Sequence, residues 1–266
     1  MRLTSSTSLI AKALKRGRSV LNRHGYDIHP VDSRCWEDQR ALLGNHQDTL
    51  IFDVGANCGQ TAWQYRNLFP NARIYCFEPQ PDLCRGLENR FRDDPKISIY
   101  ACAVGATEGT ADFYLNAKRA TSSLLAPDVA HLSPSYLPML RNEEICPVRV
   151  ITVDSFASSK NLKHIDLLKM DIQGGEYEAL HGAAELLANS AIDLIYSEAF
   201  FVPMYANQPL FGDLVSYLAK WNYRLHLIYN QNINGISGRP LQADAVFVSP
   251  QLQESSVERL RTSWIT

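Results

Sequence analysis

The sequence predicts an α/β fold: a doubly wound, mostly parallel sheet of seven strands whose last strand is antiparallel. Two observations lead to this prediction. From residue 49 onward, short apolar runs alternate with segments of helical periodicity, which is the pattern of a parallel sheet covered by helices on both faces. Near the C-terminus, two strand-like runs at 223–229 and 245–248 are joined by a polar turn without a helix, so the last strand runs antiparallel to its neighbour.

The elements follow in order from apolar periodicity and from the residues that stop it. The predicted strands of the main sheet are 50–54, 73–77, 97–104, 165–172, 193–198, 223–229 and 245–248. The predicted helices are 60–69, a segment from Pro81 to the stop at Asp94-Pro95, 176–189 and 210–221. Within 105–160 the strand-like runs are 111–115 and 148–153. Between them lies a long irregular segment, 117–147, which we interpret as a lid or substrate insertion because long loops are usually functional.

One domain accounts for most of the chain. A length of 266 residues, with 45% hydrophobic and 20% charged side chains, suits a single large α/β domain, which we place at 46–252. Residues 1–45 are predicted as a basic helical extension and 253–266 as a C-terminal tail. Residues 1–23 carry six basic side chains and no acid, so the remainder has a net charge of −8 against −2 for the whole chain. This acidity argues against nucleic acid as the main partner.

The cysteines and the hydropathy of the chain bear on its location. The six cysteines form no CxxC pair and show no zinc spacing, so we expect reduced thiols in a cytoplasmic protein. The sequence has no run of about 18 apolar residues that would predict a transmembrane segment. Ile10, Leu14 and Leu21 suit an amphipathic helix, which we expect to pack on the domain or on a partner. A weak membrane-surface contact by this helix is the alternative.

A glycine turn follows the first predicted strand and is the main functional signal. It reads Asp53-Val54-Gly55-Ala56-Asn57-Cys58-Gly59, and ligands of doubly wound sheets bind beyond the carboxyl ends of the strands. Gly55 allows a sharp turn and the close approach of a ligand. Asn57 tolerates left-handed backbone, and Gly59 precedes the helix. The Asp53 carboxylate can accept a hydrogen bond from an ammonium or a hydroxyl group.

An acid, Glu78, ends the second strand 19 residues after Gly59. At this position a carboxylate can accept both ribose hydroxyls of an adenosine. The glycine spacing separates the cofactors: a pyrophosphate loop needs G-x-G-x-x-G, whereas this turn reads D-x-G-x-x-x-G. The methionine of S-adenosylmethionine has no pyrophosphate and needs an acceptor for its amino group, which Asp53 supplies. We therefore predict S-adenosylmethionine as the cofactor, with Ala103 of the third strand beside the adenine.

A second group of polar residues lies at the end of the fourth strand, in the run LLKMDIQGGE that begins at Leu167. We expect Asp171 in the crevice where methyl donor and acceptor meet. Its carboxylate can bind the methionine ammonium, orient the acceptor hydroxyl or hold a divalent ion. Lys169 lies two positions earlier, on the same side of the strand, and needs an acidic partner because a buried ammonium is costly. Asp53, Asp171 and Glu198 are its candidate partners, and a structural ion pair and a catalytic role stay open for it.

Glu198 ends the next strand and completes the candidate site. The predicted catalytic residues are Asp171, Glu198 and Lys169. The two carboxylates are the preferred bases for a hydroxyl acceptor, and His131 and His181 are weaker candidates. Carboxylates at two neighbouring strand tips also resemble the start of an oxygen-ligand metal site. Because the sequence offers no evident third ligand, we predict no metal ligand and keep a divalent ion as the minority alternative.

With these motifs in place, the chain resembles the FkbM family of methyltransferases. The matching segments are Phe52–Thr61, Cys76–Pro79, Ser122–Leu124, Thr152–Asp154, Ile165–Glu176 and Ala243–Phe247. They follow in the family's order through roughly residues 50–250, which makes the resemblance specific, and residues 1–45 lie outside it. The resemblance implies a Rossmann-like class I methyltransferase fold and S-adenosylmethionine-dependent methyl transfer. The usual acceptor in the family is an oxygen on a sugar or a polyketide-like natural product.

The chain departs from the family at one position, since the family usually has Glu where this sequence has Gln173. A neutral amide speaks against any role that needs charge at this position. Hydrogen bonding by this side chain at the start of the following helix is still expected.

The main functional hypothesis is therefore O-methylation of a hydroxyl on a sugar, glycan or natural-product metabolite. A nicotinamide-dependent oxidoreductase is the first alternative, disfavoured by the missing second glycine of the turn. A non-catalytic binding protein on a retained Rossmann-like fold is the second. The expected partner is a small-molecule or glycan acceptor, and the sequence identifies neither the acceptor nor the oligomeric state.

Overall fold

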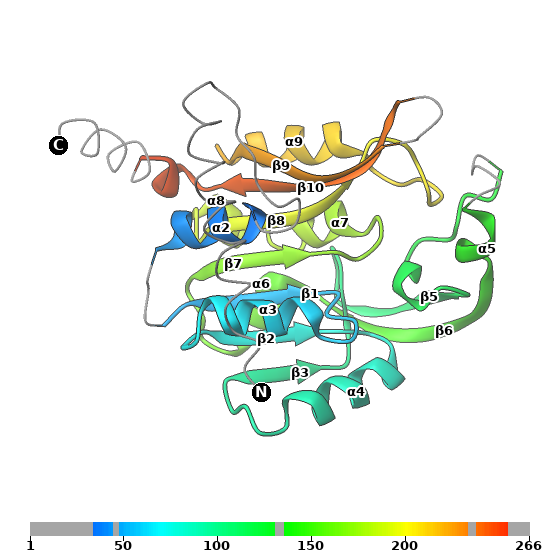
Figure 1. Cartoon of the computed structure of the whole chain (residues 1–266), viewed down its shortest axis with the longest axis horizontal. Coiled ribbons are helices and arrows are strands. Elements are labelled where there is room, and N and C mark those ends of the chain that lie inside the picture. The colour runs from blue at the N-terminus through cyan, green and yellow to red at the C-terminus, as the bar shows by residue number, and fades with distance from the viewer. Residues whose placement is uncertain (1–33, 45–47, 131–135, 234–237, 255–266) are drawn as a thin grey trace, which may run out of the picture. The chain divides into compact units, whose positions relative to one another are not determined.

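The computed structural model describes residues 34–44, 48–130, 136–233 and 238–254 (Figure 1). The chain divides into two units, 1–38 and 39–266. The amphipathic helix predicted around Ile10 and most of the predicted tail lie outside the described residues. Among the helices of the described ranges, none is both long and apolar enough to cross a membrane.

The main sheet has seven strands in the order β3-β2-β1-β7-β8-β10-β9. They are β1 (Leu50–Val54), β2 (Arg73–Phe77), β3 (Ile97–Tyr100), β7 (Ile165–Met170), β8 (Ile192–Phe200), β9 (Arg224–Ile233) and β10 (Pro240–Val248). Neighbouring strands are parallel except at β10, which runs antiparallel to both β8 and β9. The predicted doubly wound sheet with an antiparallel last strand is confirmed.

The strand order reverses between β1 and β7, and this is where ligands bind in doubly wound sheets. The chain passes from β1 to β2 and β3 on one side, then returns to place β7 on the other side of β1. The backbone N–H of Asp171 donates to the carbonyl of Val54 at 3.1 Å, and the N–H of Gly55 donates to the carbonyl of Phe77 at 3.0 Å. Backbone hydrogen bonds therefore hold the tips of β2, β1 and β7 together.

Helices connect the strands of the main sheet. They are α3 (Gln60–Leu68), α4 (Pro81–Phe91), α6 (Val153–Ser159), α7 (Glu176–His181), α8 (Ala184–Ala188) and α9 (Phe211–Ala219). The prediction of one helix over 176–189 is wrong, because the chain breaks at Gly182-Ala183. Gly182 lies so close to the backbone oxygen of Gly105 that a Cβ would overlap it. The Asp154 carboxylate then starts α8 anew by accepting from two backbone N–H groups, at 2.8 and 3.1 Å.

A second sheet of three strands has the order β4-β6-β5. Its strands are β4 (Ala103–Val104), β5 (Gly109–Asn116) and β6 (Asn142–Ile151). The prediction of a single strand over 97–104 is therefore wrong: the chain turns at Ala101-Cys102, and Ala103 pairs with Val150 of β6. Figure 1 shows this sheet, in green, beyond the carboxyl ends of β1, β2 and β7.

The segment 117–147 is more regular than the sequence predicted. It contains a 3-10 turn, η1 (Arg119–Thr121), the short helix α5 (Leu137–Leu140) and the first part of β6. The strand predicted at 148–153 also ends earlier than expected. Val153 begins α6, because the Thr152 hydroxyl caps that helix by accepting from a backbone N–H at 3.1 Å.

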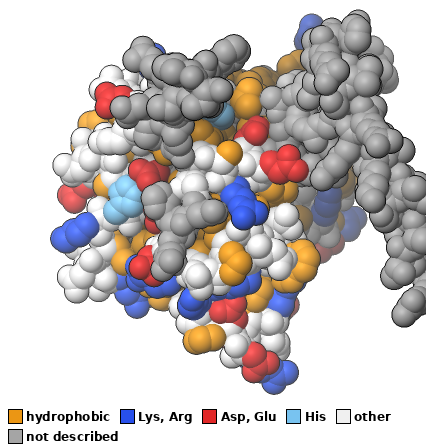
Figure 2. Space-filling view, turned by 60° about the vertical axis from the view of Figure 1, so that its left-hand side comes forward, with side chains coloured by type: hydrophobic (Ala, Val, Ile, Leu, Met, Phe, Trp, Pro, Cys, Tyr) orange, Lys and Arg blue, Asp and Glu red, His pale blue; other side chains and the backbone are white. Residues whose placement is uncertain are grey.

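The two central strands of the main sheet are deeply buried. All of β1 is buried, and so is every residue of β7 except the half-buried Asp166. Figure 2 brings forward the side of the molecule at the amino ends of these strands, where acidic, basic and apolar side chains are interspersed. The polar groups that the sequence analysis singled out lie at the opposite, carboxyl ends.

Candidate active site

A cleft of about 900 Å³, measured to its open mouth, lies at the carboxyl ends of the central strands. Its walls come from the tips of β1, β2 and β7, from the start of the second sheet and from the segment around η1. Five of the predicted site residues line it, together with Gln173: they are Gly55, Asn57, Glu78, Ala103 and Asp171.

The glycine turn forms one wall of the cleft. Gly55 has a φ of +76°, and a Cβ there would overlap the backbone oxygen of Asp171. Glycine is therefore required both by the left-handed backbone and by the closeness of the β7 tip. Gly59, with a φ of +80°, packs instead against Leu87 and Phe91 of α4. Gly55 lines the cleft as predicted, whereas Gly59 does not and serves the packing of α3 on α4.

Glu78 is held rigidly at the tip of β2. Its side chain is 3% exposed, and its two oxygens accept from the backbone N–H groups of Asn57 and Gln80, each at 2.9 Å. Burial raises the pKa of this carboxyl group, against the effect of these hydrogen bonds. Each carboxylate oxygen has a second lone pair, so Glu78 can accept two further hydrogen bonds from a ligand in the cleft.

Asp53 and Lys169 form an ion pair beneath the turn. Asp53 is fully buried, and its Oδ1 lies 2.8 Å from Lys169 Nζ. The ammonium also donates to the carbonyls of Gly55 at 2.8 Å and Val54 at 3.2 Å. Burial lowers the pKa of Lys169, but Asp53 and Asp171 outweigh it, so the pKa is raised and the ammonium stays charged. Neither side chain lines the cleft; together they fix β7 to the end of β1.

Replacement of Lys169 by Met is expected to lower the free energy of unfolding by about 3–5 kcal/mol, because it leaves the buried Asp53 carboxylate unpaired. The double variant Asp53→Asn with Lys169→Met removes both charges and is expected to recover part of this loss. Urea denaturation measures both values, and Lys163→Met, at an exposed lysine, is the control. Equal losses in the single and the double variant would contradict the importance of the ion pair.

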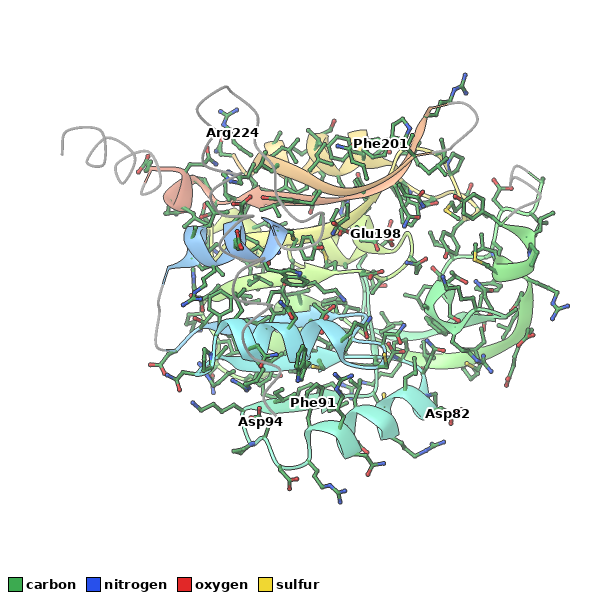
Figure 3. All side chains as sticks on the ribbon, in the orientation of Figure 1. Asp82, Phe91, Asp94, Glu198, Phe201 and Arg224 are labelled. Atoms are coloured by element: carbon green, nitrogen blue, oxygen red, sulfur yellow. The ribbon has the colours of Figure 1, made fainter. Side chains whose placement is uncertain are left out.

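One amide joins Asp171 and Glu198. Gln173 Nε2 donates to Asp171 Oδ1 at 3.0 Å and to Glu198 Oε2 at 2.7 Å. The amide oxygen of Gln173 in turn accepts from the hydroxyl of Tyr205 at 2.9 Å. Asp171 is exposed to the cleft, whereas Glu198, labelled in Figure 3, is only 8% exposed. The two predicted carboxylates are thus brought together, with Asp171 as the accessible member.

Glu198 is suited to hold a proton. Burial raises its pKa well above the usual value, and the nearby Asp171, Glu176 and Asp244 raise it further. Its other oxygen, Oε1, accepts from the side-chain amide of Gln242 at 3.1 Å. A buried carboxyl group fixed by two amides and surrounded by acids is a poor direct contact for a substrate, and the exposed Asp171 remains the better candidate.

Three residues of this network were missed by the sequence analysis: Tyr205, Gln242 and Ser123. Tyr205 is buried, and its hydroxyl also lies 2.8 Å from the carbonyl of Thr121. The Ser123 hydroxyl donates to the backbone oxygen of Gln173 at 2.8 Å. Of these three residues, only Ser123 could have been identified from the sequence, because it belongs to one of the segments that resemble the FkbM family. Tyr205 lies in a loop and Gln242 on β10, where no local pattern marks them.

Glu176 fixes the turn that carries Asp171 and Gln173. Its side chain is 2% exposed, and its oxygens accept from the backbone N–H groups of Ile172 at 2.8 Å and Gly174 at 2.9 Å. Burial raises the pKa of this carboxyl group from 4.5 to about 7. Glu176, the first residue of α7, therefore holds the preceding turn in place through a carboxyl group that titrates near neutral pH.

This raised pKa predicts a pH dependence of stability. Between the unfolded pKa of 4.5 and the folded pKa of about 7, the folded chain binds the Glu176 proton more tightly than the unfolded chain does. The free energy of unfolding is therefore expected to fall as the pH rises through this window, by on the order of 1–3 kcal/mol. Glu176→Gln, which cannot titrate, is expected to flatten this fall in urea denaturation series. Glu178→Gln, at an exposed neighbour, should leave it unchanged; the same slope in both variants would refute the assignment.

Ala103 lines the cleft as expected, whereas His181 is not among the residues that line it. His181 packs between the rings of Tyr177 and Tyr217, with ring centroids 4.7 and 4.2 Å away, and His131 lies outside the described residues. Among the described residues, one group has side-chain atoms close enough to share a metal ion: His164, Asp166 and Asp193. These residues flank the amino ends of β7 and β8, far from Asp171 in the sheet, so the group does not bear on the cleft.

Comparison with known proteins places the chain in a family. The model of the methyltransferase FkbM domain matches residues 53–225. A 2-O-methyltransferase, NoeI, of Sinorhizobium fredii (strain NBRC 101917 / NGR234) is 28% identical over 186 residues, which cover 67% of this chain and 74% of that protein. Methyltransferase 1 of Beauveria bassiana (strain ARSEF 2860) is 23% identical over 170 residues, which cover 58% of this chain and 68% of that protein.

A solved structure is also similar, at a greater distance. It is the precorrin-6y C5,15-methyltransferase of Geobacter metallireducens GS-15, with 11% identity, coverage of 80% of this chain and 87% of that one, and a TM-score of 0.42. This score is too low to support an argument, so the fold class rests on the strand order described above. The family model covers more than half of the chain and includes both the glycine turn and the Asp171 turn. The chain therefore belongs to the FkbM methyltransferase family, and it is a methyltransferase.

Proposed function

We propose that the chain transfers the methyl group of S-adenosylmethionine to a hydroxyl oxygen of a sugar or a similarly hydroxylated metabolite. The observation that carries this proposal is the composition of one cleft. Glu78, fixed by two backbone N–H groups, and Asp171, exposed and fixed by an amide, both line it. The Glu78 carboxylate suits the ribose of the cofactor, and the Asp171 carboxylate suits the end of the cleft where the methyl group is transferred.

The residues of the cleft fit S-adenosylmethionine. Each oxygen of Glu78 retains a lone pair for one ribose hydroxyl. Phe77, Cys102 and Ala103 line the same part of the cleft and provide a small apolar wall for an adenine ring. Asp171 offers an acceptor to the methionine ammonium. The buried position of Asp53 favours a supporting role for that residue, so Asp171 takes over the ammonium contact expected for it.

S-adenosylmethionine supplies an activated methyl group, so the chain has to place the acceptor oxygen in line and remove its proton. Asp171 is the accessible carboxylate and accepts the hydroxyl proton. Gln173 fixes the orientation of Asp171, and Glu198 takes the other hydrogen of the same amide. Lys169 has a positioning role and does not itself contact the substrate, because its ammonium fixes the carbonyls of the glycine turn.

Two facts support oxygen on a polyhydroxylated acceptor. The accessible charged group at the reacting end of the cleft is the Asp171 carboxylate, a hydrogen-bond acceptor that suits a molecule offering O–H donors. In addition, the relative of 28% identity carries the name 2-O-methyltransferase. The family resemblance to enzymes that act on sugars and natural products points the same way.

Glu78→Gln is the test of the cofactor assignment. Because the amide has one acceptor oxygen in place of two, binding of S-adenosylhomocysteine is expected to weaken by about 10–100-fold, as for the loss of one hydrogen bond to a charged group. Isothermal titration calorimetry measures the dissociation constant. The control is Glu88→Gln on the exposed face of α4. Equal affinity in wild type and Glu78→Gln would show that the cofactor does not use this acid.

A further inference from the structure

The roof of the cleft carries two cations. Lys118 and Arg119 are the basic residues among those that line the cleft, and both are exposed. Within the described part of the chain, no acid forms an ion pair with either side chain. Two exposed cations that line a binding cleft without an acidic partner in the described residues are available for a ligand.

Hydrogen bonds hold the backbone of this segment in place, so the points from which the two side chains extend are fixed. The backbone N–H of Lys118 donates to the carbonyl of Met139 at 3.1 Å, and the Thr121 hydroxyl donates to the carbonyl of Lys118 at 2.8 Å. At one end of η1 the side-chain amide of Gln80 donates to the carbonyl of Arg119 at 3.3 Å. At the other end the Tyr205 hydroxyl reaches the carbonyl of Thr121 at 2.8 Å.

These contacts also locate the roof relative to the two halves of the cleft. Gln80 follows Glu78, which the proposed function assigns to the ribose. Tyr205 donates to Gln173, which fixes Asp171 at the reacting end. The segment with Lys118 and Arg119 therefore crosses from the cofactor half to the acceptor half.

The charges of the cofactor do not account for two cations at this place. S-adenosylmethionine carries a positive sulfonium and a positive ammonium, and the proposed function gives the ammonium to the acid Asp171. Its single carboxylate belongs to the methionine end, beside the glycine turn, where the N-terminal N–H groups of the nine-residue helix α3 are available. Lys118 and Arg119 belong instead to the segment around η1, where the carbonyl of Arg119 accepts from the side chain of Gln80.

We propose that the acceptor is anionic, and that Lys118 and Arg119 bind its carboxylate or phosphate group while its hydroxyl faces Asp171. This inference rests on the proposed function and narrows its substrate class to acidic sugars, sugar phosphates and comparable acidic metabolites. Arg presents a planar fork that matches carboxylate and phosphate oxygens, and Lys adds a point charge.

The test uses the full-length chain, a cell extract and S-adenosylmethionine with an isotopically labelled methyl group. After incubation, small molecules are separated on an anion exchanger, and label is measured in the retained and the unretained pools. Label in the retained pool supports the inference. Treatment of that pool with a phosphatase then distinguishes the sources, since label from a phosphate monoester moves to the unretained pool and label from a carboxylate stays. Label confined to the unretained pool overturns the inference and leaves the proposed function standing, whereas no label in either pool overturns both.

Variants assign the effect to the two cations. Lys118→Gln with Arg119→Gln is expected to reduce labelling of the retained pool at least tenfold, the effect of losing one or two charge-assisted hydrogen bonds. The matched control is Arg92→Gln with Lys163→Gln, which removes two exposed cations near the amino ends of the strands. Binding of S-adenosylhomocysteine, measured by calorimetry, is expected to stay within about twofold of wild type in both double variants. A tenfold weaker affinity in the Lys118 and Arg119 variant would mean that the cations hold the cofactor carboxylate, and would overturn the inference.

Discussion

Gly55→Ala is expected to destabilise the chain by about 2–5 kcal/mol and to abolish measurable binding of S-adenosylhomocysteine. The left-handed backbone at Gly55, with φ +76°, costs a residue with a Cβ about 1–2 kcal/mol. The overlap of that Cβ with the backbone oxygen of Asp171 adds the cost of an overpacked site, about 1–3 kcal/mol. Relief of this overlap separates the tips of β1 and β7, which together form the floor of the cleft.

Urea denaturation and calorimetry measure the two effects of Gly55→Ala separately. The matched control is Gly86→Ala in the middle of α4, where a Cβ meets open space. Because alanine is the better helix former, this control is expected to gain about 0.5–1 kcal/mol. A Gly55→Ala chain that is as stable as wild type and binds S-adenosylhomocysteine normally would show that the close approach of the two strand tips is not needed.

Asp171→Asn is expected to lower the rate constant of methyl transfer by about 10²–10⁴-fold, the usual effect of removing a general base. The side chain keeps its size and one acceptor oxygen, so binding of S-adenosylhomocysteine should weaken by no more than about tenfold. Single-turnover transfer of labelled methyl to the acceptor pool measures the rate. A loss of rate that is much larger than the loss of affinity shows that Asp171 removes the proton and does not only bind the cofactor.

A control and a second variant make the Asp171 result decisive. Asp93→Asn changes an exposed carboxylate before β3 and is expected to leave the rate unchanged. If Asp171→Asn also retains the full rate, the base lies elsewhere, and Glu198→Gln tests the next candidate. Loss of cofactor binding equal to the loss of rate would restrict Asp171 to the ammonium contact.

The sequence predicted the main sheet well because its strands are short apolar runs with clear stops. The prediction failed where the pairing strand changes within a continuous apolar run. Residues 97–104 contain no glycine, proline or charged residue. The chain nevertheless turns at Ala101-Cys102, because Ala103 pairs with β6, some fifty residues away in the sequence. The break at Gly182 likewise depends on the close approach of Gly105. Long-range contacts of this kind leave no local periodicity.

The sequence predicted the residues of the candidate site that lie at the strand tips, but not the arrangement of those buried beneath the tips. Glu78 and Asp171 follow strands directly, so their position alone places them in the cleft. The alternation of side chains put Lys169 on the same side of its strand as Asp171, with Asp53 as one of three candidate partners. It did not show that Lys169 pairs with Asp53 beneath the turn, outside the lining of the cleft. The bridge formed by Gln173 depends on a left-handed backbone, with φ +59°, and on a tyrosine from another loop, neither of which a strand pattern contains.

The ion pair under the glycine turn limits how this cofactor site can be redesigned. Lys169 belongs to β7, yet its ammonium fixes three oxygens of β1 and of the turn that follows it. The segment 53–59 is therefore not a self-contained module that can be transplanted into another doubly wound sheet. A graft of the turn has to bring the lysine of the neighbouring strand with it, and a change at either of positions 53 and 169 is tolerated only in company with a change at the other.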